Sequence, residues 1–331
     1  MDLKRWRFFL APFSYIYFLI ISLRNIFYKY HIFKGYALQA RVISVGNITW
    51  GGTGKTPAAV FIAQALLKQG KKLSVLIRGY GNDEADLLSK LVPGVVVASG
   101  KDRVKTGQGT ITGHSVDTIL LDDGFQYRRL KRDLDIVCID ATDPFGNGWA
   151  IPMGSMREGL RGLERADIFL ITKVDLVEDG NRLKELEHRL RTINPKATLA
   201  KSIHSPRYFY RLTDEKIIDA GELKDKKLIL VSAIGSPRSF EKIISNLGLS
   251  TEKHFIFRDH YWYKKKDLEK IRSYCTQSGI NTVITTEKDA IRLKAIKHEI
   301  GDLNFLILSI KLDITENEKG FFNRLFGIYS S

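Results

Sequence analysis

The segment from Arg41 to Gly70 constrains the fold of this 331-residue chain more than any other. It begins with a short apolar run at residues 41–45, passes through a glycine-rich stretch at 46–56, and continues with apolar residues that recur at helical spacing up to Lys68. A proline follows the glycine-rich stretch and suits the first turn of a helix, where its missing N–H is not needed. A buried strand, a flexible turn and a helix in this order are typical of a parallel α/β sheet.

The glycine-rich stretch ends in GGTGKT, which in this context predicts a phosphate-binding loop, or P-loop. Backbone N–H groups would hold phosphate, the ammonium of Lys55 would reach the terminal phosphates, and the Thr56 hydroxyl would bind Mg²⁺. The usual spacing has glycine at position 49, where this chain has threonine. The alternative, a glycine turn that only caps a helix, explains neither Lys55 nor Thr56. The residues predicted to bind the nucleotide are Thr49, Trp50, Gly51, Gly52, Thr53, Gly54, Lys55 and Thr56.

A second part of the nucleotide site is predicted where the apolar run 118–121 ends in Asp122 and Asp123. Acidic groups at the carboxyl end of a strand can reach the metal ion or its waters. Asp-Asp-Gly is also a favourable turn sequence, and the two interpretations are compatible.

Further apolar runs are continuous, which predicts strands buried on both faces of a parallel sheet. They lie at 73–77, 95–98, 136–139 and 168–171, and a second series lies at 228–232, 254–257, 282–285 and 305–308. The predicted fold class is α/β: a P-loop domain with a parallel sheet and helices on both faces, a smaller second α/β domain, and an amino-terminal membrane-associated helix. The predicted boundaries are 1–40 for the amino-terminal segment, 41–202 for the P-loop domain, 203–225 for a connector and 226–331 for the smaller domain.

The amino-terminal run from Phe8 to Leu23 has sixteen residues and no charge. A membrane-spanning helix needs about 20 apolar residues, and this run is shorter and contains Pro12. A signal peptide would need a cleavage site with small residues, and none follows. We therefore favour a helix in the membrane interface, with a buried core helix as the alternative. Basic residues on both sides of the run favour an anionic, cytoplasmic leaflet.

Charge and cysteine content exclude several classes of protein. The net charge is +15, and residues 1–41 contain seven Lys or Arg residues against one Asp. A nucleic-acid-binding protein usually spreads its basic charge over a folded face, so no nucleic-acid partner is expected. The two cysteines, Cys138 and Cys275, form no C-x-x-C pair, which argues against a disulfide framework and a structural zinc site.

One alternative function is a P-loop GTPase or partition-type ATPase that acts as a membrane-associated switch. The segment TKVD at 172–175 resembles a guanine-reading N-K-x-D loop, but Thr172 replaces its asparagine. Trp50 stands where partition ATPases have a second lysine, and Leu121 stands where a D-x-x-G switch has its aspartate.

Six ordered motifs identify a closer relationship. The chain contains SVGNITWGGTGKTP, IRGYG at 77–81, DDGFQYRRL at 122–130, FGNGW at 145–149, PMGSMRE at 152–158 and TTEKDAIRL at 285–293. Together they resemble the tetraacyldisaccharide 4'-kinase family of lipid A biosynthesis, and the amino-terminal helix and FRDHYWY at 257–263 also fit. The resemblance covers nearly the whole chain.

The resemblance implies an ATP-dependent lipid kinase. It would transfer the γ-phosphate of ATP to the 4'-hydroxyl of a tetraacyl glucosamine disaccharide 1-phosphate, with Mg²⁺ as cofactor. Its partners would be this lipid substrate and the anionic inner leaflet. Its location would be the cytoplasmic face of the bacterial inner membrane, either peripheral or with a short amino-terminal anchor.

The resemblance also implies catalytic residues. Asp83 would accept the proton of the sugar hydroxyl with His260 as its partner, and Lys55 would stabilise the transferred phosphoryl group. Thr56, Glu84, Asp122 and Asp123 would contact the metal ion directly or through water. The alternatives are a solvated loop acid for Asp83 and a surface histidine for His260. Because the predicted boundaries put these two residues in different domains, the active site would then lie in a cleft that domain closure assembles.

Two positions depart from the family pattern. The family usually has a longer insertion after R-G-Y-G, followed by G-D-E-P, whereas here residues 82–85 follow at once as Asn-Asp-Glu-Ala. Tyr127 stands where the family has histidine in D-D-G-F-Q-H. Four basic residues are further candidates for phosphate contact, with ordinary surface positions as the alternative: Arg78, Arg128, Arg129 and Arg157.

Overall fold

The computed structural model describes residues 9–79 and 83–330, and these form two compact units. Unit 1 contains residues up to 79, 91–203 and 312–330; unit 2 contains 83–90 and 204–311. Two long strands, β7 (Thr198–Arg211) and β12 (Asn304–Glu316), contribute residues to both units.

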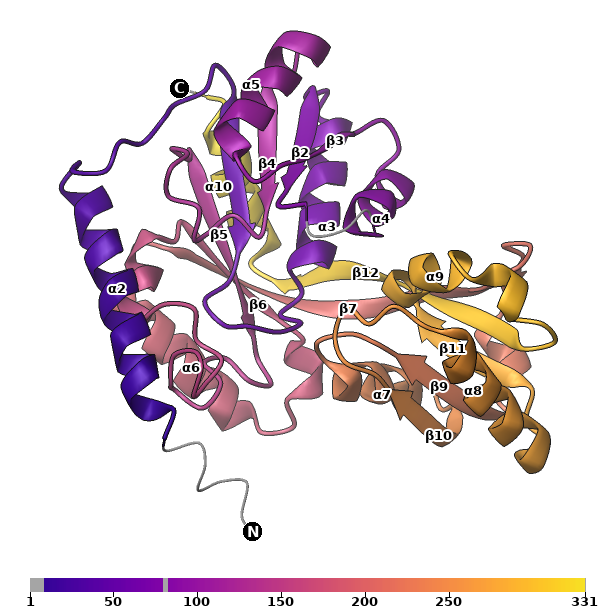
Figure 1. Cartoon of the computed structure of the whole chain (residues 1–331). Helices are drawn as coiled ribbons and strands as arrows, with labels where there is room; N and C mark the ends of the chain where they lie inside the picture. The colour runs from indigo at the N-terminus through magenta and orange to yellow at the C-terminus, as the bar shows by residue number, and fades with distance from the viewer. Residues whose placement is uncertain (1–8, 80–82, 331) are drawn as a thin grey trace. The chain divides into compact units, whose positions relative to one another are not determined.

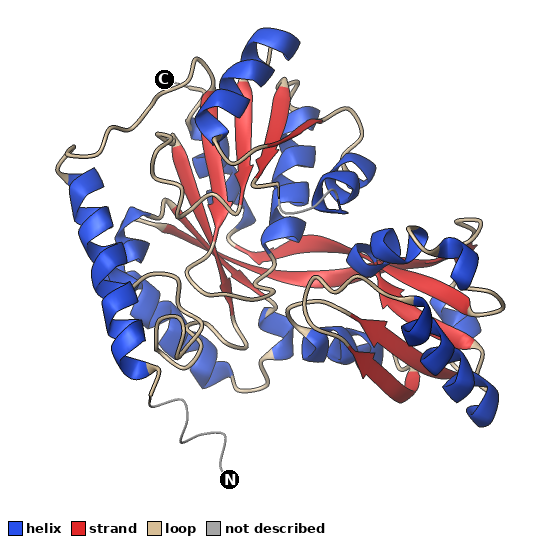
Figure 2. Ribbon diagram, viewed as in Figure 1, coloured by secondary structure: helices blue, strands red, loops and turns tan. Residues whose placement is uncertain are grey.

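Unit 1 is built on a parallel sheet with helices on both faces (Figures 1 and 2). Its strand order is β7-β6-β5-β1-β4-β2-β3, and each neighbouring pair is parallel. Every residue of β2, β4, β5 and β6 is buried, as the continuous apolar runs predicted. The strands are β1 (Arg41–Gly46), β2 (Leu73–Ile77), β3 (Val96–Ser99), β4 (Thr118–Asp122), β5 (Leu134–Asp140), β6 (Ile168–Thr172) and the first part of β7.

Helices α5 and α6 pack on apolar clusters that include Ile119 and Leu121 of β4 and Val137 and Ile139 of β5. The helices of unit 1 are α2 (Ala11–Lys29), α3 (Lys55–Lys68), α5 (Arg103–His114), α6 (Gly180–Ile193) and α10 (Glu318–Gly327), with short 3₁₀ turns η1 (Leu160–Arg165) and η2 (Val174–Leu176).

The strands of unit 2 belong to the same continuous sheet and have an apolar cluster on each face. Alternate residues of β9 separate the two clusters: Ile229 and Val231 face one, and Leu228 and Leu230 face the other. The strand order is β10-β9-β11-β12-β7, with β8 antiparallel to β7. The elements are α4 (Asp83–Leu91), β8 (Ile217–Ile218), η3 (Ala220–Leu223), β9 (Lys227–Ser232), α7 (Pro237–Asn246), β10 (Ser250–Ile256), α8 (Lys265–Ser278), β11 (Thr282–Thr286), α9 (Glu287–Lys294) and η4 (Lys297–Glu299).

The predicted α/β class is confirmed, but the division of the chain differs from the expected boundaries. The structure groups residues 83–90 with unit 2 and residues 312–330 with unit 1. Part of the expected connector is regular structure, because β7 continues to Arg211. The chain passes between the units along β7 and β12, and no change of composition in these strands marks the boundary in the sequence.

Helix α2 has one docked face and a largely exposed apolar surface. Ser14 is its only buried residue; its hydroxyl donates to the carbonyl of Ala150 and accepts from the N–H of Met153, both at 2.9 Å. The large apolar side chains that remain exposed on the helix are Phe13, Tyr15, Ile16, Phe18, Leu19, Ile20, Leu23 and Ile26. The alternative of a buried core helix is therefore wrong. Phe8 and the basic residues before it lie outside the described residues. Among the helices of the described chain, none has the length and hydropathy needed to cross a bilayer.

The grouping of α10 with unit 1 gives a stability prediction. Phe321 is fully buried, and its ring centroid lies 6.0 Å from that of Phe61 on α3. We expect Phe321→Ala to lower the free energy of unfolding by about 3–5 kcal/mol, the usual cost of deleting a buried phenyl ring. Phe322→Ala is the matched control, because that ring is only partly buried and should cost less. Thermal or urea unfolding measures both. Equal, small losses would show that α10 adds little to the core.

Candidate functional site

The P-loop connects β1 to α3 and takes its shape from glycine. Gly51 and Gly54 have φ angles of +128° and +84°, in the region that residues with a side chain rarely adopt. Gly54 is also the residue immediately before α3, so the loop leads directly to the N-terminus of this helix. The predicted strand, glycine turn and helix are thus confirmed as local structure.

Buried side chains hold the loop from inside. The Asn47 amide donates to the carbonyl of Thr49 at 2.6 Å and to the hydroxyl of Thr53 at 2.8 Å. From the end of β6, the hydroxyl of Thr172 donates to the carbonyl of Thr53 at 3.0 Å, and Lys173 Nζ donates to the carbonyl of Gly52 at 2.7 Å. These contacts hold the loop in one conformation through its carbonyls and the Thr53 hydroxyl, and the N–H groups of Trp50 and Thr53 donate to the carbonyls of Ser155 and Gly51.

The first two residues of the TKVD segment contact the P-loop backbone. Lys173 is buried, and its ammonium also pairs with Asp140 at the end of β5. Asp140 and Thr172 are register partners in the β5–β6 pair, which explains why these groups lie together. Sequence reasoning compared this segment with a guanine-reading loop and missed its contact with the P-loop.

Three cationic side chains surround Asp123, directly after β4. Lys55 Nζ lies 3.7 Å from Asp123 Oδ1, Arg157 Nη1 lies 2.6 Å from the same oxygen, and Arg103 donates to the Asp123 carbonyl at 3.0 Å. Burial acts to raise the pKa of Asp123, but the charges of Lys55, Arg157 and Arg103 outweigh it and hold the pKa below its usual value. The Asp123 carboxylate is therefore ionised and keeps Lys55 beside the loop.

Asp122 and Thr56 lie at the same edge of the sheet as the loop. In the parallel pair of β1 and β4, Asp122 is the register partner of Val45, directly before the loop. Both Asp122 and Thr56 are buried. In the described part of the chain, no group of three or more His, Cys, Asp or Glu side chains has the arrangement of a metal site. A nucleotide-bound Mg²⁺ does not need such a group, because one or two protein ligands, phosphate oxygens and water complete its coordination.

Of the remaining candidates in unit 1, Arg157 joins the loop region. Its guanidinium also lies 5.3 Å from the ring centre of Trp50, which is 66% exposed, whereas Thr49 is buried. Arg128 donates to the carbonyl of Asn25 on α2, Arg129 pairs with Asp102, and Arg78 is exposed. Arg157 thus contacts two predicted site residues, Asp123 and Trp50.

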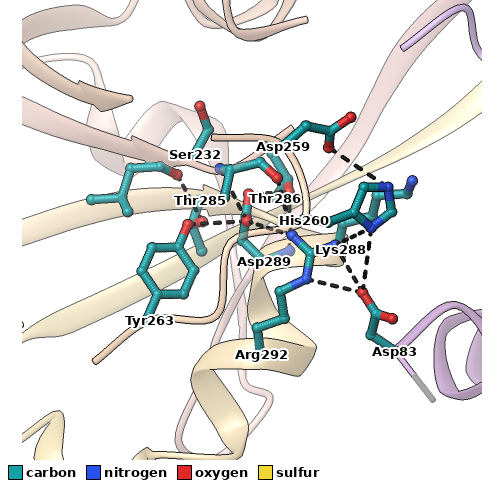
Figure 3. A network of polar contacts seen from close by, with 12 residues as sticks. Asp83, Ser232, Asp259, His260, Tyr263, Thr285, Thr286, Lys288, Asp289 and Arg292 are labelled. Atoms are coloured by element: carbon teal, nitrogen blue, oxygen red, sulfur yellow. Dashed lines mark hydrogen bonds and ion pairs between the residues drawn. The ribbon is translucent and has the colours of Figure 1, made fainter. Parts of the chain in front are cut away.

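Unit 2 contains the second set of predicted residues, which meet in a polar network (Figure 3). Asp83 is the first residue of α4, His260 lies in the loop after β10, and Arg292 lies near the end of α9. His260 Nδ1 is 3.9 Å from Asp83 Oδ2, and the Arg292 guanidinium donates to that oxygen from Nε at 3.0 Å and Nη2 at 2.8 Å. Asp83 and His260 thus lie together within one unit, and their meeting requires no domain closure.

The surroundings of Asp83 exclude a solvated loop acid, because its side chain is buried and ion-paired. Burial acts to raise the pKa of Asp83, but the hydrogen bonds and charge of Arg292, with a smaller effect of His260, hold it below its usual value. His260 is half-exposed and also lies 3.8 Å from Asp259. Glu84 lies beside Asp83 in unit 2 and pairs with Lys288 at 3.7 Å.

A pocket of about 400 Å³ lies against Asp83 in unit 2. Its lining includes the apolar side chains Leu87, Ala290 and Ile291 and the aromatic rings of Tyr210 and Trp262. Two lysines of the lining, Lys90 and Lys294, share the carboxylate of Glu215, so their charges are partly compensated. Arg292 lies in the TTEKDAIRL motif at 285–293 and was not among the predicted site residues. The sequence contains one indication of its role: Asp289 and Arg292 are three residues apart, which places them on one side of a short helix.

The whole chain is similar to one family of known proteins. A sequence model of the family described as tetraacyldisaccharide-1-P 4'-kinase matches residues 6–86 and 82–327. The two matched segments overlap at 82–86.

Named relatives agree with this match. The tetraacyldisaccharide 4'-kinase of Halothermothrix orenii is 35% identical over 93% of this chain and 89% of that relative. The tetraacyldisaccharide 4'-kinase of Bdellovibrio bacteriovorus is 32% identical over 94% of this chain and 95% of that relative. The crystal structure of the "apo" form of LpxK from Aquifex aeolicus in complex with ATP superposes with a TM-score of 0.74 at 29% identity, covering 98% of this chain and 99% of that chain. The family predicted from the ordered motifs is confirmed: this chain belongs to the tetraacyldisaccharide-1-P 4'-kinases.

Proposed function

We propose that this protein transfers the γ-phosphate of ATP to the 4'-hydroxyl of a tetraacyl glucosamine disaccharide 1-phosphate. The observation that carries the proposal is the P-loop of unit 1, where Lys55 is held beside the loop by Asp123. Family membership supplies the acceptor, and the ATP complex of the Aquifex aeolicus relative supports ATP as the donor.

Within unit 1, the roles follow from charge and position. The N–H groups of Gly54, Lys55 and Thr56, where α3 begins, bind the phosphates, because a helix N-terminus attracts anions. Lys55 and Arg157 carry the positive charge that offsets the charge developing on the transferred phosphoryl group. Asp123 orients both cations. Trp50 and Thr49 complete the loop side of the nucleotide site.

Thr56 and Asp122 fit the role of holding Mg²⁺ better than Asp123 does, because the cations around Asp123 already compensate its charge. A hydroxyl after the P-loop lysine and a carboxylate at the end of a neighbouring strand are the usual protein contacts of a nucleotide-bound magnesium ion. When bound, Mg²⁺ neutralises charge on the phosphate oxygens. Glu84 remains a candidate for a water-mediated contact.

Asp83 takes the proton of the sugar hydroxyl, and His260 assists it. A sugar hydroxyl is a weak nucleophile, so a carboxylate that stays ionised can accept its proton as the phosphoryl group is transferred. The pKa of Asp83 lies below its usual value, so the carboxylate is ionised at neutral pH and is in the form that can accept a proton. The adjoining pocket, with its aromatic rings, is the candidate position for the sugar that presents the hydroxyl.

The GTPase or partition-type ATPase alternative is not favoured. Thr172 and Lys173, which would read a guanine base in such proteins, are bound to the P-loop backbone instead. The same phosphoryl-transfer assay run with GTP as donor tests this point.

Helix α2 is proposed to lie in the membrane interface at the cytoplasmic face of the inner membrane. Its exposed aromatic and aliphatic side chains suit the boundary between headgroups and acyl chains, and the exposed Lys29 at its end suits an anionic surface. This position would bring the enzyme to a substrate whose acyl chains stay in the bilayer.

Lys55→Ala should remove phosphoryl transfer while leaving the fold intact. Loss of one cation at the transferred group should lower kcat by about 10³-fold or more. The measurement is 4'-phosphate formation from labelled ATP and the tetraacyl disaccharide 1-phosphate in detergent. Lys68→Ala, an exposed lysine in the last turn of the same helix, is the control and should keep full activity. Activity of Lys55→Ala within a few-fold of wild type would remove the P-loop from the mechanism.

Asp83→Asn and His260→Ala should each lower kcat by about 10²–10⁴-fold with little change in the KM for ATP. The double variant should be little worse than the slower single variant, because groups that act as one unit are not additive. Asp302→Asn is the control, since Asp302 pairs with Arg272 in the same unit and has no described contact with Asp83. Additive losses would separate the two residues, and a normal rate for Asp83→Asn would make Glu84 the next residue to test.

Replacing Leu19 and Ile20 together by glutamate should release the protein from vesicles that contain anionic phospholipid. Each side chain is more than half exposed, and losing the burial of either one in the interface should weaken binding by about tenfold or more. Ile217→Glu is the control, because Ile217 is a similarly exposed aliphatic residue of unit 2. Co-sedimentation measures binding. Unchanged pelleting of the double variant, with its melting temperature preserved, would assign membrane contact to another surface.

A further inference from the structure

The guanidinium of Arg292 is completely buried in unit 2. Its side chain has an exposed fraction of 0%, and by volume it is the largest fully buried side chain in the described part of the chain. Removing a charge from water is costly unless the charge is paired and hydrogen-bonded. All three of its nitrogens have partners: Nε and Nη2 reach Asp83, and Nη1 donates to the carbonyl of Ala233 at 3.0 Å.

Both hydrogen bonds from Arg292 to Asp83 converge on one oxygen, Oδ2. Two donors in the fixed plane of a guanidinium fix the position of the oxygen that accepts from both of them. Because both of these donors of Arg292 bind Oδ2, the proton of the acceptor hydroxyl would go to the other oxygen, Oδ1.

Arg292 also reaches His260. Nη2 lies 3.3 Å from His260 Nδ1 and can only donate, so Nδ1 accepts and the proton of the neutral ring is on Nε2. Asp83 Oδ2 and His260 Nδ1 are themselves 3.9 Å apart, too far for a hydrogen bond. Asp83 and His260 are therefore connected through Nη2 of Arg292.

Asp289, one turn earlier on α9, anchors Arg292 (Figure 3). Asp289 Oδ1 lies 3.6 Å from Arg292 Nη1 and accepts from Tyr263 Oη at 3.0 Å and from the N–H of Ala233 at 3.1 Å. Asp289 Oδ2 accepts from the hydroxyl of Thr286 at 2.7 Å. The guanidinium thus rests on a fixed platform of buried groups and holds Asp83 and His260 from there.

We propose that Arg292 is a positioning residue for phosphoryl transfer, which holds the carboxylate of Asp83 and the ring of His260 in one fixed arrangement. The inference rests on the proposed function, in which Asp83 accepts the proton of the acceptor hydroxyl. Arg292 acts on the rate through Asp83 and His260 and makes no contact of its own with either substrate.

The first test is Arg292→Lys in the full-length protein. Lysine keeps the positive charge but cannot donate from two fixed nitrogens to one oxygen, so kcat should fall by about 10–100-fold while the KM for ATP changes little. Arg272→Lys is the matched control: Arg272 in the same unit pairs with Asp302 and donates to the carbonyls of Glu299 and Ile300, and its variant should keep the wild-type kcat.

Asp83→Asn, assayed in parallel, separates the two proposals. Normal activity of Asp83→Asn would remove the proposed role of Asp83. Loss of activity in Asp83→Asn together with a wild-type kcat in Arg292→Lys would overturn the positioning role alone.

A second measurement uses the unmodified protein and is independent of whether a variant folds. The ¹⁵N chemical shifts of the His260 ring at neutral pH should show an unprotonated Nδ1 and a protonated Nε2. A proton on Nδ1 would overturn the arrangement in which Arg292 donates to that nitrogen.

Discussion

The parallel pairing of β1 between β4 and β5 is the constraint on which the nucleotide site depends. It brings three strand ends to one edge of the sheet: the P-loop after Gly46, Asp122 at the end of β4 and Asp140 at the end of β5. The next pair, β5 with β6, sets Thr172 opposite Asp140. A register shift of one residue would turn each of these side chains to the opposite face. The register of a few apolar strands therefore fixes where Asp122, Asp140 and Thr172 lie at this edge.

The loop combines conformational freedom with strong restraint. Glycine permits the backbone at Gly51 and Gly54, whereas Asn47, Thr172 and Lys173 hold its carbonyls and hydroxyl. Phosphoryl transfer depends on positioning and on charge stabilisation, so a loop that is already held in place needs little reorganisation when the reaction occurs. The contacts from Thr172 and Lys173 come from a strand end more than 100 residues later in the sequence.

In unit 2, a cluster of buried charges is likewise held in place by residues that are distant in the sequence. One guanidinium lies between two carboxylates, Asp83 and Asp289, and neutral donors from Ala233, Tyr263 and Thr286 satisfy the second. Removing one member of such a cluster leaves an uncompensated buried charge, which is strongly destabilising. The stability of this part of unit 2 and the geometry around Asp83 thus depend on the same residues.

The sequence by itself determined the local parts of the protein. A strand, a glycine turn and a helix, with Lys55 and Thr56 at the junction, follow from periodicity and from glycine's backbone freedom, and an apolar run that ends in Asp122 and Asp123 is equally local. Which distant groups meet was decided only by the tertiary structure. Asp83 lies in unit 2, where it pairs with Arg292, which is 209 residues away in the sequence. Lys173 contacts a loop residue 121 positions before it. The extent of β7 beyond residue 203 and the exposed face of α2 likewise depend on neighbours in space. Periodicity records which face of an element is apolar, but the partner of a buried charge is chosen by the packing of whole elements.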